Sequence, residues 1–208
     1  MTFEQLIEKI GPKNAAEWHQ HANGGGWVQN TATVDASTFI GESVIVFATA
    51  RVYENARVYG NAQVYGNARV YGNAQVFGTA RVYENARVYE NAQVYGNAQV
   101  YGNAQVYGNA WVYGDAQVYG DAQVCGTARV YGDAQVYGNA WGKSPLFIIG
   151  SKFSATNCKH GHVKIGCECH TVKWWLENGV KLAKVHNFTE AEIEEYRAIV
   201  ELFVKIGK

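Results

Sequence analysis

The chain has 208 residues, with 18 basic and 18 acidic side chains, so its formal net charge is zero. This balance argues against a protein that binds nucleic acid or a membrane surface through bulk charge. We see no secretory leader and no apolar run long enough to span a bilayer, and four cysteines fit a reducing compartment, so we expect a cytoplasmic protein with no membrane partner.

Residues 1–26 are predicted to form a helical cap. Apolar side chains at helical spacing over residues 3–10 predict a first helix, and Pro12 is expected to end it. Asn14 is placed to cap a second short helix that runs to about Ala22. A cap is needed because the open end of a repeat structure exposes unpaired strand edges.

From Trp27 to Trp141 the chain repeats one six-residue phrase, most often Val-Tyr-Gly-Asn-Ala-Gln. Counting in sixes from Val28 to Val136 gives 19 positions, of which 18 are Val and one is Ile40. Side chains alternate between the two faces of an extended segment, so Val and Ala are expected to face inward and Tyr and Gln or Arg outward. Gly followed by Asn supplies the corner, because both residues tolerate the left-handed backbone region. Strands and corners without intervening helices predict a solenoid.

The repeat resembles the hexapeptide repeat of left-handed parallel β-helix proteins, in which three units form one triangular coil. The resemblance implies a mainly β protein with about six coils over residues 27–141, the helical cap before them, and a small α+β domain at 142–208. The chain departs from that family at the residue after Val, which is mostly Tyr here and often Gly in the family. Catalytic and non-catalytic proteins share this fold, so the resemblance does not give the function.

Residues 18 apart are expected to stack on successive coils about 4.8 Å apart, which places aromatic columns on three outward faces. Stacking within the sheets explains such columns, but aromatic area on a surface is also typical of an interface. We therefore expect a homo-oligomer with Tyr95, Trp111 and Tyr113 at its interface. The first coils also present apolar side chains outward, and the helical cap is expected to cover them: Trp27, Phe39, Ile45 and Phe47.

One outward column holds stacked arginines beside stacked tyrosines: Arg51, Arg69 and Arg87, and Tyr53, Tyr71 and Tyr89. Like charges at this spacing repel each other, so they require either nearby carboxylates or a bound anion. Glu54 and Glu90 are the candidates for intramolecular pairing. Arginine beside tyrosine also suits a small anionic ligand such as a nucleotide, or an acidic protein surface. Both interpretations stay open.

The repeat lacks the residues of the known enzymes with this architecture. No histidine lies between Ala22 and Lys159. The acyltransferases that the repeat resembles have a catalytic histidine and loops that interrupt the coils, and the carbonic anhydrases of this architecture bind zinc through three histidines. We therefore expect a non-catalytic protein, with a degenerate acyltransferase as the less favoured alternative.

After the repeat, residues 146–208 are predicted to form an α+β unit. Strands are expected at Leu146–Ile149, Lys152–Cys158 and Val163–His170. A helix begins after Thr171 and is expected to end near residues 178–179. A second helix begins with a capping box, in which Thr189 and Glu192 bond to each other's backbone.

This unit holds a cluster of possible metal ligands within 13 residues: Cys158, His160, His162, Cys167, Cys169 and His170. Four of them could hold zinc in a tetrahedral site, although the spacing matches no standard Cys-x-x-Cys knuckle. Alternatively, Cys167 and Cys169 are ordinary buried thiols on the strand face of Val163 and Ile165. A Cys–His nucleophilic pair is a third interpretation, but no orienting acid is evident.

The segment Gly-Gly-Gly-Trp-Val, the repeats, and Ile165–His170 followed by Trp174 resemble uncharacterised hexapeptide-repeat proteins of bacteriophages and bacteria. This resemblance implies a phage accessory protein that blocks a host protein or captures a signalling nucleotide. We expect a non-catalytic binding or scaffold protein, in one form a phage-encoded inhibitor. Its partner would be a host or phage protein. The alternative is a binder of a small anionic molecule through the Arg and Tyr side chains.

Overall fold

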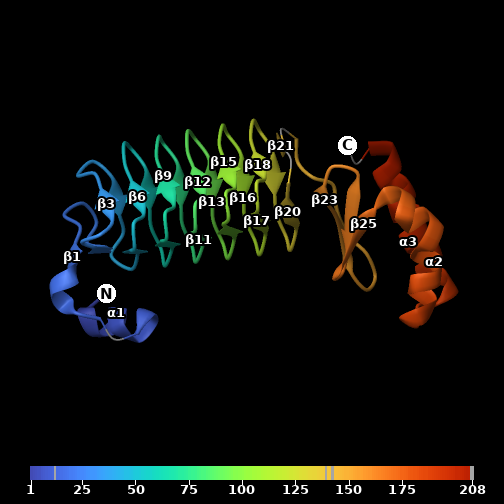
Figure 1. The fold of residues 1–208 in the computed structure, drawn as a ribbon, viewed down its shortest axis with the longest axis horizontal. Helices are drawn as coiled ribbons and strands as arrows, with labels where there is room; N and C mark the ends of the chain where they lie inside the picture. The colour runs from blue at the N-terminus through green and yellow to red at the C-terminus, as the bar shows by residue number, and fades with distance from the viewer. Residues whose placement is uncertain (12, 139, 142, 207–208) are drawn as a thin grey trace.

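The computed structural model describes residues 1–11, 13–138, 140–141 and 143–206. Pro12 and Gly142, where the sequence predicts the end of the first helix and of the repeat, lie outside the described residues. Figure 1 shows an elongated β-solenoid with a helical segment at its N-terminal end and a sheet with two helices at its C-terminal end. Of the helices described, none is both long and apolar enough to cross a membrane.

The solenoid consists of about six coils whose short strands form three parallel sheets. The first sheet contains β2 (Trp27–Gln29), β5 (Ile45–Val46), β8 (Gln63–Val64), β11 (Arg81–Val82), β14 (Gln99–Val100), β17 (Gln117–Tyr119) and β20 (Gln135–Tyr137). The second contains β4 (Phe39–Ile40), β7 (Arg57–Val58), β10 (Gln75–Val76), β13 (Gln93–Val94), β16 (Trp111–Val112) and β19 (Arg129–Val130). The third contains β3 (Thr33–Val34), β6 (Arg51–Val52), β9 (Arg69–Val70), β12 (Arg87–Val88), β15 (Gln105–Val106), β18 (Gln123–Val124) and β21 (Ala140–Trp141).

The predicted inside and outside of the repeat are confirmed. In the regular coils from Val46 to Val136, the Val position is fully buried, and so is nearly every Ala position. Through most of the solenoid, residues 18 apart pair in register, as Val76 does with Val94. The corners need glycine for two reasons. Gly60 has a φ of 67°, and a Cβ there would lie 2.8 Å from the carbonyl oxygen of Gly78.

The N-terminal segment covers three of the four residues expected beneath it, with Phe39 outside the cluster, and its described residues contain one α-helix and not two. Helix α1 (Phe3–Ile10) buries Leu6 in a cluster with Trp18 and Ile45, and Trp27 and Phe47 pack against this cluster. The expected second helix is wrong. After Asn14 there is a single 3₁₀ turn, η1 (Ala15–Glu17), and then strand β1 (Trp18–Gln20), which pairs antiparallel with β2. This pairing extends the first sheet and supplies hydrogen-bond partners to its edge.

The C-terminal unit is a four-stranded antiparallel sheet followed by two helices. Its elements are β22 (Phe147–Ile149), β23 (Ser154–Lys159), β24 (His162–Ile165), β25 (Glu168–Thr171), α2 (Val172–Val185) and α3 (Glu190–Ile206). Both predicted helix starts are confirmed, since Thr171 accepts from the Trp174 amide at 3.1 Å and Thr189 forms its capping box with Glu192.

Two predictions for this unit are wrong. The expected strand over 163–170 is divided into β24 and β25 by a tight turn, in which Gly166 has a φ of 59°. Helix α2 does not end near Gly179 but continues to Val185. The low helix propensity of Gly costs only about 1 kcal/mol, which the packing of α2 against α3 and the sheet overcomes.

The C-terminal sheet has two different faces. Ala155, Val163 and Ile165 lie on the face that packs against α2 and α3. The other face meets the last coils of the solenoid, where Lys164 donates to the side chain of Gln135 and Ser154 donates to Asp133 at 2.8 Å. Figure 1 shows this order of solenoid, sheet and helices.

Candidate functional site

The tyrosines of the repeat form continuous stacks along the solenoid. On the third sheet, the rings of Tyr53 and Tyr71 lie 4.8 Å apart at an interplanar angle of 4°. Tyrosine hydroxyls on all three sheets donate to a glutamine 16 residues later: Tyr59 to Gln75, Tyr83 to Gln99, Tyr89 to Gln105, Tyr101 to Gln117, and Tyr107 to Gln123. These contacts explain why Tyr follows Val here, and they support a structural role for the aromatic columns.

The predicted arginine column is present on the third sheet. Arg51, Arg69 and Arg87 lie directly opposite one another on β6, β9 and β12. Arg51 and Arg87 are exposed and Arg69 is half-buried. Among the ion pairs of the described residues, none involves these three guanidinium groups.

The predicted pairing of these arginines with Glu54 and Glu90 is corrected by the structure. The Glu54 carboxylate accepts a hydrogen bond from the Gly72 amide at 2.8 Å, and Glu90 accepts one from Gly108 at 2.8 Å. Both glutamates occupy corner positions with positive φ, 63° and 59°. Their carboxylates therefore hold the corner of the next coil rather than neutralise the arginines.

Two tyrosines beside the column lack the glutamine partner that Tyr89 and Tyr107 have further along the same stack. The residue 16 positions after Tyr53 is Arg69, and the residue 16 positions after Tyr71 is Arg87, so neither hydroxyl finds an amide oxygen there. Burial raises the pKa of Tyr53 and of Tyr71 above the usual value of 10.0, while the neighbouring arginines oppose this shift. Both hydroxyls therefore stay protonated at neutral pH and can donate to an anion. Tyr89, in contrast, is bonded to Gln105.

The second predicted interaction face lies on the second sheet. Trp111 meets the ring of Tyr95 edge-on at 6.4 Å, and Tyr95 stacks on Tyr113 at 5.0 Å. The Arg129 guanidinium lies 4.5 Å from the centre of the Trp111 ring. Trp111 is half-buried by these contacts within its own chain. The three predicted residues are therefore brought together, with partial cover from Arg129.

The six predicted metal ligands do not form one cluster. Among the residues described by the structure, no three His, Cys, Asp or Glu side chains lie where they could hold a metal ion. Neighbouring residues of a strand point to opposite faces, so Cys169 faces the solenoid while His170 faces helix α2. His170 bonds to Glu168 at 2.9 Å and stacks on Trp174 at 3.6 Å.

The remaining members of the predicted cluster are also separated. The ring of His160 stacks on Trp141 at 5.2 Å, and His162 bonds through Nδ1 to the carbonyl oxygen of His160 at 3.0 Å. Cys167 is exposed in the turn between β24 and β25. Its predicted burial on a strand face with Cys169 is therefore wrong, because the turn ends the strand.

The thiols of Cys158 and Cys169 are brought together at the junction with the solenoid. Cys169 lies opposite Lys164, not on the face of Val163 and Ile165, because the turn shifts the register. Its Sγ is 3.1 Å from the hydroxyl of Tyr137. A hydrogen bond from Cys158 lowers the pKa of Cys169 to about 6, and Tyr137 and nearby positive charges act in the same direction. Cys158 is fully buried, and its pKa is raised by sharing a proton with Cys169 and by burial.

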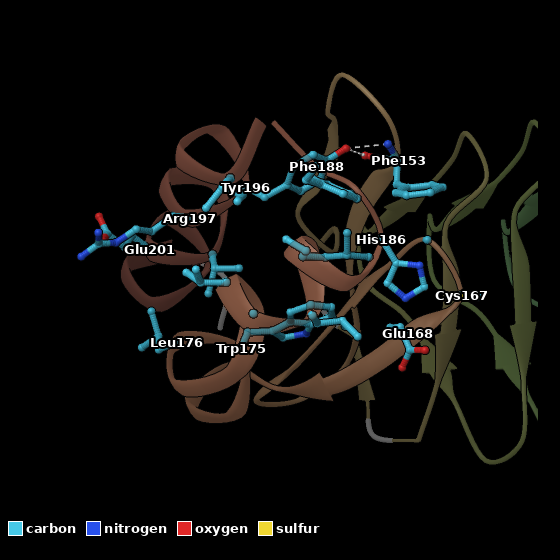
Figure 2. Close-up of a pocket in the computed structure, with 18 residues that line it drawn as sticks. Phe153, Cys167, Glu168, Trp175, Leu176, His186, Phe188, Tyr196, Arg197 and Glu201 are labelled. Carbon is cyan, nitrogen blue, oxygen red and sulfur yellow. Dashed lines mark hydrogen bonds and ion pairs between the residues drawn. The ribbon is translucent and has the colours of Figure 1, made fainter. Parts of the chain in front are cut away.

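The structure also contains a cavity that the sequence analysis did not predict. It has a volume of about 530 Å³ and lies between α2, α3 and the C-terminal sheet. In Figure 2 the side chains of Trp175, Leu176, Phe188 and Tyr196 surround it. At its edges lie Arg197 and Glu201 on one side and His186 and Glu168 on the other.

A sequence signal for the cavity exists in α2. Trp175, Gly179 and Ala183 recur at a spacing of four residues and therefore share one helix face. Two of these three residues have little or no side chain, which leaves space between the helices. A helix that ended near Gly179, as expected from the sequence, would not include Ala183, so this shared face was not predicted.

Comparison with known proteins agrees with the repeat architecture. A family model described as the YdcK beta solenoid repeat matches residues 62–78, 80–96, 98–114, 104–120 and 116–138. All these matches lie within the solenoid. No curated protein and no solved structure matches the chain. The similarity concerns the β-solenoid repeat, which is consistent with a scaffold or binding role.

Proposed function

We propose that this protein is a non-catalytic binding protein that recognises an acidic segment of a partner protein through the third sheet of its solenoid. One observation carries the proposal: Arg51, Arg69 and Arg87 stack in register, and no ion pair among the described residues joins them to a carboxylate. Maintaining three like charges in one column is unfavourable without a counter-charge. An anionic partner would supply it.

The dimensions of the column favour an extended partner. Three arginines on successive strands span roughly 10 Å, given a strand separation of about 4.8 Å. An extended segment with several carboxylates can contact all three. The hydroxyls of Tyr53 and Tyr71 lie beside them as further donors. Because the strands hold these side chains on a regular sheet, binding would order little additional backbone.

The biological setting that we propose follows from the resemblance to hexapeptide-repeat proteins of phages and bacteria. In the cytoplasm of an infected cell, such a protein would act as an inhibitor that covers an acidic surface of a host protein. The second candidate is a small anionic ligand such as a nucleotide, which the paired arginine and tyrosine side chains favour.

The test uses two triple variants that remove the same number of arginines from different sheets. R51Q/R69Q/R87Q removes the stacked column, whereas R57Q/R81Q/R129Q removes three arginines from the other two sheets. Glutamine is the natural residue at eight of the 19 positions of this kind, from residue 27 to residue 135, so both variants should fold. Calorimetry with poly-glutamate as the probe should show at least about tenfold weaker binding for the first variant only, and binding of the parent should weaken with salt.

Equal effects of the two triple variants would mean that bulk charge, not the column, binds the probe, and would contradict the proposal. Binding of ATP but not of poly-glutamate would identify the small-anion alternative. If poly-glutamate binds as expected, the same pair of variants then serves as bait and control in a pull-down from host cells.

A further inference from the structure

We propose that the cavity between α2, α3 and the C-terminal sheet binds a small apolar molecule that is neutral or carries a single positive charge. Its volume of about 530 Å³ lies within the range of small-molecule sites in proteins, roughly 300–1,000 Å³. The site lies outside the solenoid, and this inference does not rest on the anion-binding surface proposed above.

The chemistry of the cavity wall excludes a polar ligand body. The two aromatic residues with polar atoms in the wall are already bonded within the chain. Nε1 of Trp175 donates to the carbonyl oxygen of Val163 at 2.8 Å. The hydroxyl of Tyr196 donates to the carbonyl oxygen of Phe153, also at 2.8 Å. A polar group placed against Trp175 or Tyr196 would lose its water without gaining a partner. The other polar lining side chains lie at the cavity edge: Cys167, Glu168, His186, Arg197 and Glu201. The part of the ligand inside the cavity must therefore be apolar.

The charges at the cavity edge select against an anion. The charged lining residues are Glu168, Glu201 and Arg197, with a formal sum of −1. The one arginine is not free, because its Nε lies 3.4 Å from the Glu201 carboxylate. Glu168 bonds to His170 at 2.9 Å. An anionic head group would meet repulsion with no unpaired arginine to offset it, whereas a neutral or cationic molecule would not.

The cavity is open to solvent at an apolar rim. Leu176 is 50% exposed, Val180 is 44% exposed and Phe153 is 46% exposed. Deeper in the site, Trp175 and Tyr196 are buried. This gradient provides an entrance lined by apolar side chains that an apolar molecule can contact on its way in. Gly179 and Ala183 keep the centre of the α2 wall free of bulk.

The experiment fills the cavity with a larger side chain on its α2 wall. In Gly179→Leu the new Cβ meets Trp175 at 3.4 Å, an ordinary contact, and the rest of the side chain occupies the space between the helices. Lys181→Leu is the matched control, because it places the same side chain on an exposed position of α2 that does not line the cavity. The probes are Nile red, which is neutral and apolar, and anilinonaphthalene sulfonate, which is anionic.

We expect Nile red to bind the full chain at about one molecule per protein, with a blue-shifted emission, and to bind Lys181→Leu equally well. Gly179→Leu should weaken binding at least tenfold while raising the unfolding temperature, because it fills space and replaces a helical glycine. Ala183→Leu provides a second filled variant if the first does not fold. The anionic probe should bind more weakly than Nile red.

Two results would overturn the inference. One is undiminished Nile red binding in both filled variants. The other is a chain that self-associates in sedimentation experiments and dissociates when Nile red is added, which would identify a second copy as the occupant. The third-sheet variant R51Q/R69Q/R87Q should leave Nile red binding unchanged, so failure of the proposed anion site and failure of this inference are distinguishable.

Discussion

The hydroxyl of Tyr83 donates to Oε1 of Gln99 at 3.1 Å and thereby links one aromatic ladder to the strand of the next coil. The same bond forms at four other places where Tyr and Gln are separated by 16 residues. Tyr119 is an exception, because Gln135 instead accepts from Lys164. Where the later position is arginine, the bond is replaced by a positive charge. The solenoid thus gives up a stabilising contact at four arginine positions: Arg69, Arg81, Arg87 and Arg129.

The first prediction follows from this relationship. Arg87→Gln should raise the free energy of unfolding by about 0.5–1.5 kcal/mol, because Tyr71 gains a glutamine acceptor. The change also removes one of three like charges. Urea denaturation measures the change in the free energy of unfolding. Arg51→Gln, in the same column, is the control, since the residue 16 positions before it is Asp35 and no tyrosine hydroxyl can donate there. An equal gain in both variants would show that charge, not the hydrogen bond, is responsible.

The second prediction concerns a corner glutamate. Glu84 has a φ of 58°, and its carboxylate accepts from the Gly102 amide at 2.8 Å. Glu84→Ala keeps the strained backbone and loses the bond, so it should destabilise the chain by about 1–2 kcal/mol. Glu84→Gly loses the same bond but relieves the strain, so its unfolding free energy should stay close to that of the parent. Thermal or urea unfolding that ranks the two variants in the opposite order would contradict this explanation.

The third prediction tests the narrow core. Val94 is fully buried, while Gln99 is one of the outward positions. Val94→Lys should unfold the solenoid, because an unpaired ammonium in an interior of Val and Ala costs several kcal/mol. Gln99→Lys should leave the far-ultraviolet circular dichroism nearly unchanged and lower the melting temperature by only about 2–4 °C, because it loses the hydrogen bond from Tyr83 but buries no charge. Similar melting of the two variants would mean that the inside and outside have been assigned incorrectly.

The fourth prediction concerns the thiol at the junction. The pKa of Cys169 is lowered from 9.0 to about 6, so its reactive thiolate should predominate above about pH 6. Its alkylation by iodoacetamide should therefore rise through that pH and level off by about pH 8. Tyr137→Phe removes a donor that stabilises the thiolate, which should slow alkylation at pH 6.5 but not at pH 9.5. Mass spectrometry of the peptide that contains Cys169 measures both rates, and unchanged alkylation at pH 6.5 would argue against the role of Tyr137.

The fifth prediction is self-association through the face of Tyr95, Trp111 and Tyr113. Trp111 keeps part of its surface exposed beneath Arg129, and flat sheet faces can pair without ordering loops. Light scattering should show a homo-oligomer for the parent and a smaller particle for Trp111→Arg. Gln93→Arg, one coil earlier in the same column, is the matched control for added charge. A monomeric parent at micromolar concentration would contradict the prediction.

The repeat determined the solenoid without help from tertiary contacts. A period of six with Val and Ala at fixed places permits only one set of inward side chains, because burying the Gln and Arg positions would be too costly. Residues 18 apart therefore pair, and the positions of Arg51, Arg69 and Trp111 on outward columns follow directly. The helix starts at Thr171 and Thr189 could also be predicted from neighbouring residues alone, since a capping side chain bonds to backbone within three residues.

Only the tertiary structure decided what lies between distant segments. The strand β1 depends on pairing with β2, and the length of α2 depends on packing against α3, so local propensity misjudged both. The Cys and His residues are close in sequence, but one tight turn and the alternation of strand faces send them to different surroundings. The cavity forms where two helices meet a sheet, and no single stretch of sequence contains it. Contacts within a repeat are set by its period, whereas contacts between elements depend on how their surfaces fit.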